Sequence, residues 1–186
     1  MSDWNSDTAE WYAKKYGEYA TNQLGIASLS LSADAIVVDI GCGTGSALRH
    51  ASKSVTTGTL IGIDPIARMV EIAKENTIGH AAADRIEYFQ AGAESLPVKD
   101  AFADWVLAFD SYDHWQDQQA GLSEVRRVLK SEGKFVVVKD GGLPSGDAAK
   151  TNFLSDLEDA GFKVVEEKDI SENDVSFTLW KCVVNN

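Results

Sequence analysis

The feature that most constrains the fold is a short apolar run followed by an acid and three closely spaced glycines, Val37-Val38-Asp39-Ile40-Gly41-Cys42-Gly43-Thr44-Gly45. β-Branched residues that lead into a glycine turn indicate a buried strand, and Ser46 opens a segment typical of a helix. The glycines permit a tight turn and the close approach of a ligand to the main chain. The start of the helix offers free N–H groups and a positive dipole end to that ligand. The stretch predicts the first strand, turn and helix of a doubly wound α/β sheet.

A second apolar run that ends in an acid, Leu60-Ile61-Gly62-Ile63-Asp64, follows, and its acid stands nineteen positions after Gly45. A carboxylate at the end of the second strand is placed to accept hydrogen bonds from the two hydroxyls of a ribose. The glycine spacing departs from the dinucleotide pattern G-x-G-x-x-G/A, because Ser46 stands at its last position and the third glycine comes one place early. The two runs together predict a site for a nucleoside cofactor.

Five blocks of the sequence resemble the class I S-adenosylmethionine-dependent methyltransferases, most closely the compact group that acts mostly on small molecules. In order, the blocks are VVDIGCGTG, LIGIDPIARMVEIAKEN, YFQAGAESLPV, ADWVLAF and LSEVRRVLKSEGKFVVVKD. The resemblance implies an α/β fold: a Rossmann-like, doubly wound, mostly parallel seven-stranded sheet with a C-terminal antiparallel hairpin and helices on both faces. It also implies S-adenosylmethionine as the cofactor, S-adenosylhomocysteine as its product, and a small-molecule methyl acceptor.

Hydrophobic patterning predicts the other elements of a single domain, residues 1–186, with a core over 35–186. Strands are expected over 35–39, 59–63, 85–90, 104–109, 134–139, 162–167 and 175–184, the last two joined by a polar turn. Helices are expected over 46–53, from Pro65 onward, and over 78–84, 117–130 and 147–160, with Gly133 placed to break the fourth of them.

Residues 1–34 precede the sheet and are expected to contain a helix capped by Ser6 or Asp7. Most of its aromatic rings fall on one face: Trp11, Tyr12, Tyr16 and Tyr19. One interpretation is an amphipathic helix packed on the domain. The resemblance adds a second, a lid over the cofactor that excludes water and holds a sulfonium cation by cation–π attraction. Tyr16 and Trp11 are the first candidates for that contact.

The resemblance carries over a set of cofactor-binding positions near the glycine turn and the strand ends: Asp39, Gly41, Cys42, Gly43, Gly45, Asp64, Pro65, Met69, Ala93, Glu94, Phe109 and Tyr16. Asp64 fits the ribose, and Asp39 is expected to order the glycine turn near the amino group of the donor. Cys42 stands at a helix start, where a thiol pKa can be lowered. The turn requires only a small side chain there, however, and a nucleophilic role is not expected.

Recognition of adenine is assigned to two further segments. Pro65 and Met69 would flank the base, although Met69 fits plain core packing equally well. Gly92 stands where relatives often carry an acid. Adenine is therefore expected to be read by the backbone of Ala93 and the side chain of Glu94, with a helix-capping or exposed role for Glu94 as the alternative.

Two loops leave the carboxyl ends of strands, where ligands bind in open parallel sheets. They are Asp110-Ser111-Tyr112-Asp113-His114-Trp115 and the glycine-rich segment 140–146. Methyl transfer from a sulfonium mainly needs alignment and the exclusion of water. A base is needed only where the acceptor loses a proton. Asp110 and His114 are the candidates, and a structural His114 bonded to backbone is the favoured alternative.

The charge and the cysteine content of the sequence argue against nucleic acids and metal ions as ligands. The 186 residues include 17 Lys and Arg against 29 Asp and Glu, a net charge of -12, which repels the phosphate backbone of nucleic acids. No apolar run reaches membrane-spanning length and the N-terminus lacks a signal pattern, so a cytoplasmic protein without a membrane partner is expected. Cys42 and Cys182 form no C-x-x-C pair, and no metal site is expected.

Two other functions compete with methyl transfer. A protein that binds the nucleoside cofactor without transferring its methyl group accounts for the departure at Gly92 and for the absence of a secure catalytic residue. A nicotinamide-dependent oxidoreductase is disfavoured by Ser46 and by the later blocks. The sequence leaves open the acceptor, its accepting atom and the oligomeric state.

Overall fold

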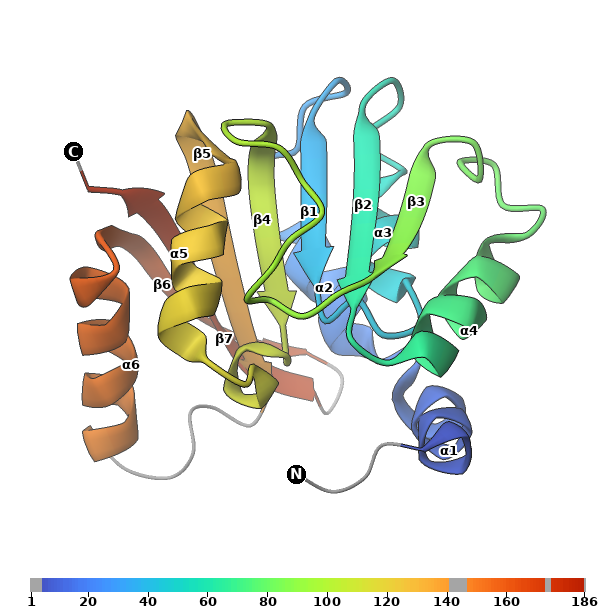
Figure 1. Cartoon of the computed structure of the whole chain (residues 1–186), viewed down its shortest axis with the longest axis horizontal. Coiled ribbons are helices and arrows are strands. Elements are labelled where there is room, and N and C mark those ends of the chain that lie inside the picture. The colour runs from blue at the N-terminus through green and yellow to red at the C-terminus, as the bar shows by residue number, and fades with distance from the viewer. Residues whose placement is uncertain (1–4, 141–146, 173–174, 186) are drawn as a thin grey trace.

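The computed structural model describes residues 5–140, 147–172 and 175–185. Seven strands form one sheet in the order β3-β2-β1-β4-β5-β7-β6 (Figure 1). They are β1 (Ile36–Ile40), β2 (Thr59–Asp64), β3 (Ile86–Gln90), β4 (Ala103–Phe109), β5 (Leu129–Asp140), β6 (Phe162–Glu172) and β7 (Val175–Val184). The first five pair in parallel, and β7 pairs antiparallel with both β5 and β6. The Rossmann-like sheet with its C-terminal hairpin is confirmed, and its strand order reverses between β1 and β4.

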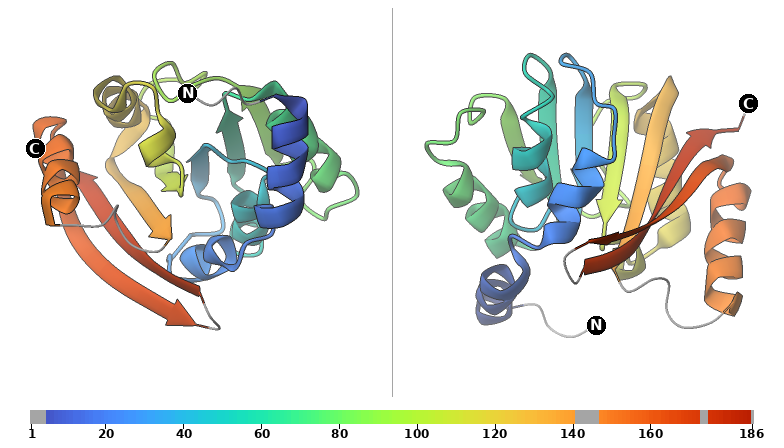
Figure 2. Two further views of the ribbon diagram at one scale, coloured as in Figure 1. Left: turned by 90° about the horizontal axis from the view of Figure 1, so that it is seen from below. Right: turned by 180° about the vertical axis from the view of Figure 1, so that it is seen from behind.

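Helices cover both faces of the sheet (Figures 1 and 2). They are α2 (Ala20–Ala27), α3 (Ser46–Ala51) and α4 (Ala67–Thr77) on one face, and α5 (Gln118–Val128) and α6 (Asp147–Asp159) on the other. Successive residues of a strand pack against the helices of opposite faces, because side chains alternate across a strand. Val37 belongs to the core that includes Leu48 of α3, and Val38 to the core that includes Leu122 of α5.

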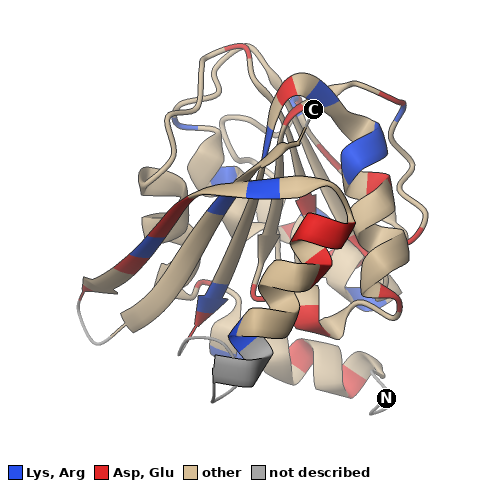
Figure 3. Ribbon diagram, turned by 90° about the vertical axis from the view of Figure 1, so that its left-hand side faces the viewer, with Lys and Arg blue, Asp and Glu red and all other residues tan. Residues whose placement is uncertain are grey.

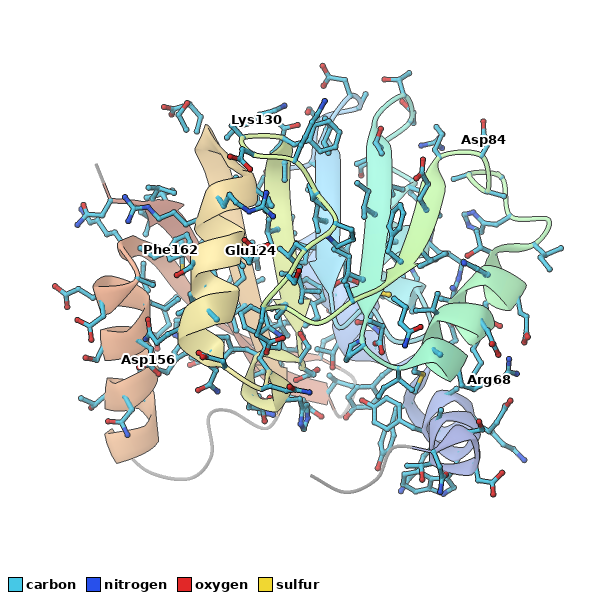
Figure 4. All side chains as sticks on the ribbon, in the orientation of Figure 1. Arg68, Asp84, Glu124, Lys130, Asp156 and Phe162 are labelled. Carbon is cyan, nitrogen blue, oxygen red and sulfur yellow. The ribbon has the colours of Figure 1, made fainter. Side chains whose placement is uncertain are left out.

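The N-terminal helix α1 (Ser6–Tyr16) lies beyond the carboxyl ends of the parallel strands, beside α4 (Figure 1). Its buried Ala9 packs with Met69 and Ile72 of α4. Arg68, labelled in Figure 4, pairs across the same interface with Glu10 at 2.6 Å. The helix is thus anchored on α4 at the edge of the sheet where a ligand would bind.

The start and the end of this helix differ from expectation. Asn5, not Ser6 or Asp7, is the cap, and its Oδ1 accepts the Thr8 N–H at 2.9 Å. The helix stops at Tyr16 and a second one, α2, begins at Ala20, so Tyr19 lies between them. Gly17 is held there, because the Thr44 hydroxyl donates to its carbonyl at 2.6 Å.

Three further boundaries were wrong. No helix forms over 78–84, because Ile78 is extended and Gly79 takes the left-handed φ of 75°. The helix expected to reach 130 ends at Val128, since the next residue already pairs with Ala103 as part of β5. Gly133 sits in the irregular part of that pairing, where a Cβ would lie 2.9 Å from the Lys130 carbonyl. β6 extends to Glu172, five residues past its expected end.

Basic and acidic residues are mixed along the described part of the C-terminal hairpin. Lys and Arg positions alternate with Asp and Glu positions along β6 (Figure 3). Among the helices of the described ranges, none combines the length and the apolarity needed to cross a bilayer.

Candidate active site

A cavity of about 280 Å³ opens at the carboxyl ends of β1, β4 and β5, where the strand order reverses. The left view of Figure 2 looks onto this edge of the sheet. Residues from the N-terminal segment, the glycine turn and the ends of β4 and β5 line it: Tyr12, Tyr16, Gly17, Tyr19, Thr21, Asn22, Asp39, Gly41, Cys42, Gly43, Thr44, Phe109, Asp110, His114, Lys139 and Asp140. The cavity thus joins the segments expected to hold the cofactor to those expected to face the acceptor.

The glycine turn is held by β2. The N–H groups of Gly41 and Cys42 donate to the Ile63 carbonyl at 2.7 and 3.1 Å. Gly43 has a φ of 53°, and a Cβ there would meet nothing within 4 Å, so its outer face is open. Gly45 has a φ of 78°, and α3 starts immediately after it. The turn presents the main chain of Gly41, Cys42, Gly43 and Thr44 to the cavity, which allows a ligand to approach the backbone closely.

Asp39 is the buried acid of the cavity. Its side chain is 2% exposed, and Oδ1 has no hydrogen-bond partner within the described ranges. Burial, together with the nearby Asp64 carboxylate, raises the pKa of Asp39 to about 7. A buried, unpaired carboxylate oxygen is costly, and a ligand that donates a hydrogen bond or brings a positive charge would satisfy it.

Asp64 lies behind the turn and not on the cavity wall. Its Oδ2 accepts the Gly43 N–H at 3.0 Å, and its Oδ1 accepts the Ile66 N–H at 2.9 Å. Burial raises the pKa of this carboxyl, and the two backbone hydrogen bonds lower it only in part. Both oxygens keep spare lone pairs for a ribose hydroxyl.

The ends of β4 and β5 are tied together at the opposite wall. Asp110 adopts the left-handed φ of 51°, which is rare for a residue with a side chain. Its Oδ1 accepts the Asp140 N–H at 2.6 Å. Burial raises the pKa of Asp110 to about 6, against the lowering effects of that hydrogen bond and of Lys139. The carboxyl can therefore exchange a proton near neutral pH.

His114 also faces the cavity, from the 3₁₀ turn Tyr112–His114 that follows β4. Its backbone N–H donates to the Ser111 carbonyl at 2.9 Å. The Ser111 hydroxyl in turn donates to the Ile40 carbonyl at 2.5 Å, which fixes the loop to the end of β1. His114 is thus carried on an anchored turn and lines the same cavity as Asp110.

Three tyrosines close the cavity from the N-terminal side. The ring centroids of Tyr12 and Tyr16 are 5.1 Å apart, and those of Tyr16 and Tyr19 are 6.1 Å apart. A hydrogen bond with Asp140 raises the pKa of Tyr19. Trp11 does not line the cavity and is 57% exposed, so of the two first candidates only Tyr16 faces inward.

The expected cofactor residues divide into two groups. Those on the cavity wall, with the two candidate bases, are Tyr16, Asp39, Gly41, Cys42, Gly43, Phe109, Asp110 and His114; those away from it are Gly45, Asp64, Pro65, Met69, Ala93 and Glu94. Met69 packs in the interface between α1 and α4, and Ala93 packs in the core beneath α5. Glu94 Oε1 accepts the Asp117 N–H at 3.0 Å, near the start of α5. These contacts match the packing and helix-capping alternatives for Met69 and Glu94.

Several lining residues were missed by the sequence reasoning. Thr21 is fully buried and its hydroxyl has no partner within the described ranges, and Asn22 lies beside it in the first turn of α2. Gly17 could have been interpreted as the end of the first helix. That interpretation predicts a second helix, α2, which contains Thr21 and Asn22. Lys139, at the end of β5, was not singled out as a site residue, although it comes from an expected strand.

The cysteine and metal expectations concern the same region. Burial raises the pKa of the Cys42 thiol well above its usual range, which opposes a nucleophilic role. The described residues contain no group of three or more His, Cys, Asp or Glu side chains arranged to hold a metal ion. Residues 141–146, most of the second candidate loop, lie outside the described ranges.

Comparison with known proteins gives consistent matches. A family model described as a methyltransferase domain matches residues 38–137. The O-methyltransferase resE of Aspergillus sclerotiorum is 30% identical, over 91% of this chain and 70% of its own length. The ubiquinone/menaquinone biosynthesis C-methyltransferase UbiE of Hahella chejuensis is 32% identical, over 58% of this chain and 43% of its own length. A solved S-adenosylmethionine-dependent methyltransferase from Aquifex aeolicus superposes with a TM-score of 0.77 at 18% identity, covering 98% of this chain and 100% of that one.

Proposed function

Since this chain belongs to the class I S-adenosylmethionine-dependent methyltransferases, we propose that it transfers the methyl group of S-adenosylmethionine to a small-molecule acceptor. One observation carries the proposal. A single cavity connects the open face of Gly43 and the unpaired oxygen of Asp39 to Asp110 and His114. The cofactor turn and the groups able to handle an acceptor proton therefore line one cavity.

The residues present fit the cofactor. Asp39 offers a buried carboxylate oxygen without a partner to the ammonium group of the amino-acid moiety, and the Gly43 backbone leaves room for close approach. Asp64, at the end of β2, is assigned to the ribose, where its spare lone pairs accept from hydroxyl groups. When bound, S-adenosylmethionine supplies a methyl group already activated by a positively charged sulfonium.

The task of this chain is then to align the acceptor and to exclude water. Tyr12, Tyr16 and Tyr19 cover the cavity from the N-terminal side, and we assign them the role of a lid. Asp110 or His114 takes a proton from an acceptor that must lose one, because both reach the cavity and the raised pKa of Asp110 suits proton exchange near neutral pH.

A small acceptor is supported by the size and charge of the site. Tyrosines close one side of the cavity, which leaves room for a small molecule rather than a polymer chain. The net charge of -12 disfavours nucleic acid. The two curated relatives are named as an O- and a C-methyltransferase, so the accepting atom is not part of the proposal. A cytoplasmic location stays a prediction, which cell fractionation would test.

Thermal unfolding of the full chain with S-adenosylmethionine, S-adenosylhomocysteine or NADH tests the cofactor. A ligand at a hundred times its Kd adds about 2.7 kcal/mol to the free energy of unfolding. We expect both adenosyl ligands to raise Tm and NADH to leave it unchanged. The absence of a shift with either adenosyl ligand at millimolar concentration would refute the proposal. Adenosyl binding that never leads to S-adenosylhomocysteine release with any small acceptor would favour a non-catalytic binding protein.

A further inference from the structure

The acceptor end of the cavity has more negative than positive charge. Among the described lining residues, Asp110 and Asp140 are the acids at this end, Asp39 lies at the cofactor turn, and Lys139 is the single Lys or Arg. The Lys139 ammonium is already paired, with its Nζ 2.7 Å from Asp113 Oδ2. The neighbouring segment 141–146 contains no Lys or Arg in its sequence, so it adds no basic side chain.

Two of these acids meet at one point of the wall. The Asp140 N–H donates to Asp110 Oδ1 at 2.6 Å, which places the two residues side by side at the ends of neighbouring strands. Asp110 is held there in a left-handed backbone conformation, with a φ of 51°, which is uncommon for a residue with a side chain. Such strain is typical of functional positions, since a structure retains it when the side chain must point in one direction.

Aromatic rings face the same space. Tyr16 and Tyr19 are in edge contact at 6.1 Å, and both line the cavity together with Asp140. The outer side of this cluster already attracts a cation, because Lys15 Nζ lies 5.0 Å from the Tyr16 ring centroid. Carboxylates combined with tyrosine faces form a site for a cation.

Two residues of the cavity wall carry buried polar atoms without a hydrogen-bond partner in the described ranges. The hydroxyl of Thr21, a fully buried residue of the wall, has no partner within the described ranges, and neither has Oδ1 of Asp39. Buried polar atoms are normally hydrogen-bonded, and an unpaired one in a native structure calls for a ligand or water. Asp39 Oδ1 is assigned above to the cofactor ammonium, so the Thr21 hydroxyl is the unpaired polar group of the described wall that is left for a second polar ligand.

S-Adenosylmethionine does not balance the charge by itself. Its ammonium is assigned to Asp39, and its carboxylate and sulfonium charges cancel, so Asp110 and Asp140 face only the ammonium of Lys139. One negative charge is left at the acceptor end. An anionic acceptor would add repulsion in a poorly solvated space, and a cationic one would remove it.

We propose that the methyl acceptor carries a protonated amine, which binds Asp110 and Asp140 beside the rings of Tyr16 and Tyr19. This inference rests on the proposed methyltransferase function and specifies the acceptor class for the same site. The amine is a recognition group and need not be the atom that is methylated. Asp110 then anchors the acceptor, and His114 is left as the proton acceptor where one is needed.

Three phenols of nearly equal shape and different charge test the inference: tyramine, 4-ethylphenol and 3-(4-hydroxyphenyl)propanoate. Their Kd values are measured by calorimetry on the full chain saturated with S-adenosylhomocysteine, which lacks the sulfonium charge. We expect tyramine to bind about tenfold or more tightly than the propanoate, with 4-ethylphenol between them, as one charge-assisted hydrogen bond predicts. Equal or tighter binding of the propanoate, or no binding of tyramine at millimolar concentration, would overturn the inference.

Substitutions test whether Asp110 and Asp140 cause the preference for tyramine over the propanoate. Asp110→Asn and, separately, Asp140→Asn are expected to reduce the preference for tyramine to less than about threefold. Asp84→Asn makes the same chemical change in an exposed residue at the opposite edge of the sheet, and should leave the preference unchanged (Figure 4). A preference that persists in both cavity variants would place the amine elsewhere and refute the site.

Failure of this inference is distinguishable from failure of the proposed function. If S-adenosylhomocysteine binds and tyramine does not, the cofactor site stands and the acceptor class is wrong. If neither adenosyl ligand binds the wild-type chain, the methyltransferase proposal itself fails. Tyramine binding that S-adenosylmethionine abolishes and S-adenosylhomocysteine does not would show that the sulfonium occupies the acidic pair, which also overturns the inference.

Discussion

The backbone N–H of Gly43 donates to Asp64 Oδ2 at 3.0 Å, so the glycine turn after β1 is tied to the end of β2. The other oxygen of the same carboxylate accepts the Ile66 N–H, immediately before α4. One buried side chain therefore orders both the turn that approaches the cofactor and the start of the next helix. Asp64 acts on the site by positioning the main chain, in addition to any contact with a ribose.

Asp64→Ala should weaken both folding and cofactor binding. It leaves two backbone N–H groups without this acceptor, and we expect the free energy of unfolding to fall by about 1–3 kcal/mol. The Kd for S-adenosylhomocysteine should rise tenfold or more, and Asp64→Asn, which keeps one acceptor oxygen, should have a smaller effect. Urea denaturation and calorimetry measure the two quantities.

Asp84→Ala is the matched control for this experiment. Asp84 is exposed in the turn before β3, at the edge of the sheet away from the cavity (Figure 4). Its removal should change the free energy of unfolding by no more than about 0.5 kcal/mol. Wild-type affinity in Asp64→Ala would show that the carboxylate neither positions the turn nor binds the cofactor.

The raised pKa of Asp39 predicts a stability that depends on pH. Burial raises that pKa to about 7, far above the value in an unfolded chain, so the folded state favours the protonated acid. The stability from this group is fully present below about pH 4 and is lost as the pH rises to about 7. At about 1.4 kcal/mol for each pKa unit, the loss is on the order of 4 kcal/mol.

Asp39→Asn isolates this contribution, because the amide never ionises. The variant and the wild type should be about equally stable near pH 4, and the variant should be the more stable of the two near pH 8. Urea denaturation across this range, without ligand, measures the difference. Parallel pH curves for the two proteins would show that folding does not raise the pKa of Asp39, and would contradict this prediction.

Tyr16 and Trp11 form a natural pair for testing the lid, because their rings are in edge contact on α1 with centroids 6.0 Å apart and only one of them lines the cavity. Tyr16 lines the cavity, whereas Trp11 is 57% exposed and lies outside it. Tyr16→Ala should raise the Kd for S-adenosylmethionine several-fold, and Trp11→Ala should leave it within about twofold. Calorimetry on both variants gives the comparison. Equal effects would mean that α1 acts through its packing on α4 and not through a ring in the cavity.

The sheet could be predicted from the sequence because its strands are apolar runs that end in acids or glycines. The pairs Asp39 with Gly41 and Asp64 with Pro65 mark strand ends whose positions follow from local chemistry. The helix expected over 78–84 failed for the converse reason. An alanine-rich composition favours a helix. Gly79 adopts a left-handed conformation instead, and the chain continues as turns to the start of β3.

The site was less predictable, since its wall is assembled by long-range contacts. The hydrogen bond between Asp140 and Asp110 joins residues thirty positions apart, and the sequence holds no local sign of it. Thr21 reaches the cavity wall because α2 packs on the sheet. The hydrophobic pattern of this segment alone does not predict that packing. Met69 and Glu94 show the limit of carrying positions over from a family, because their contacts here are with α1 and α5.

Position 45 requires a glycine for two reasons, its backbone conformation and the close approach of Tyr88. Its φ of 78° favours glycine, and a Cβ there would overlap the hydroxyl of Tyr88, which is itself 3.0 Å from the Thr77 hydroxyl. Gly45→Ala should lower the free energy of unfolding by about 2–4 kcal/mol through backbone strain and overpacking. Tyr88→Phe removes the overlapping oxygen, so the double variant should lose less stability than the sum of the two single losses. Urea denaturation of the four proteins measures this coupling. Strict additivity would mean that the cost of the alanine comes from the backbone alone, and that Tyr88 does not restrict the position that precedes α3.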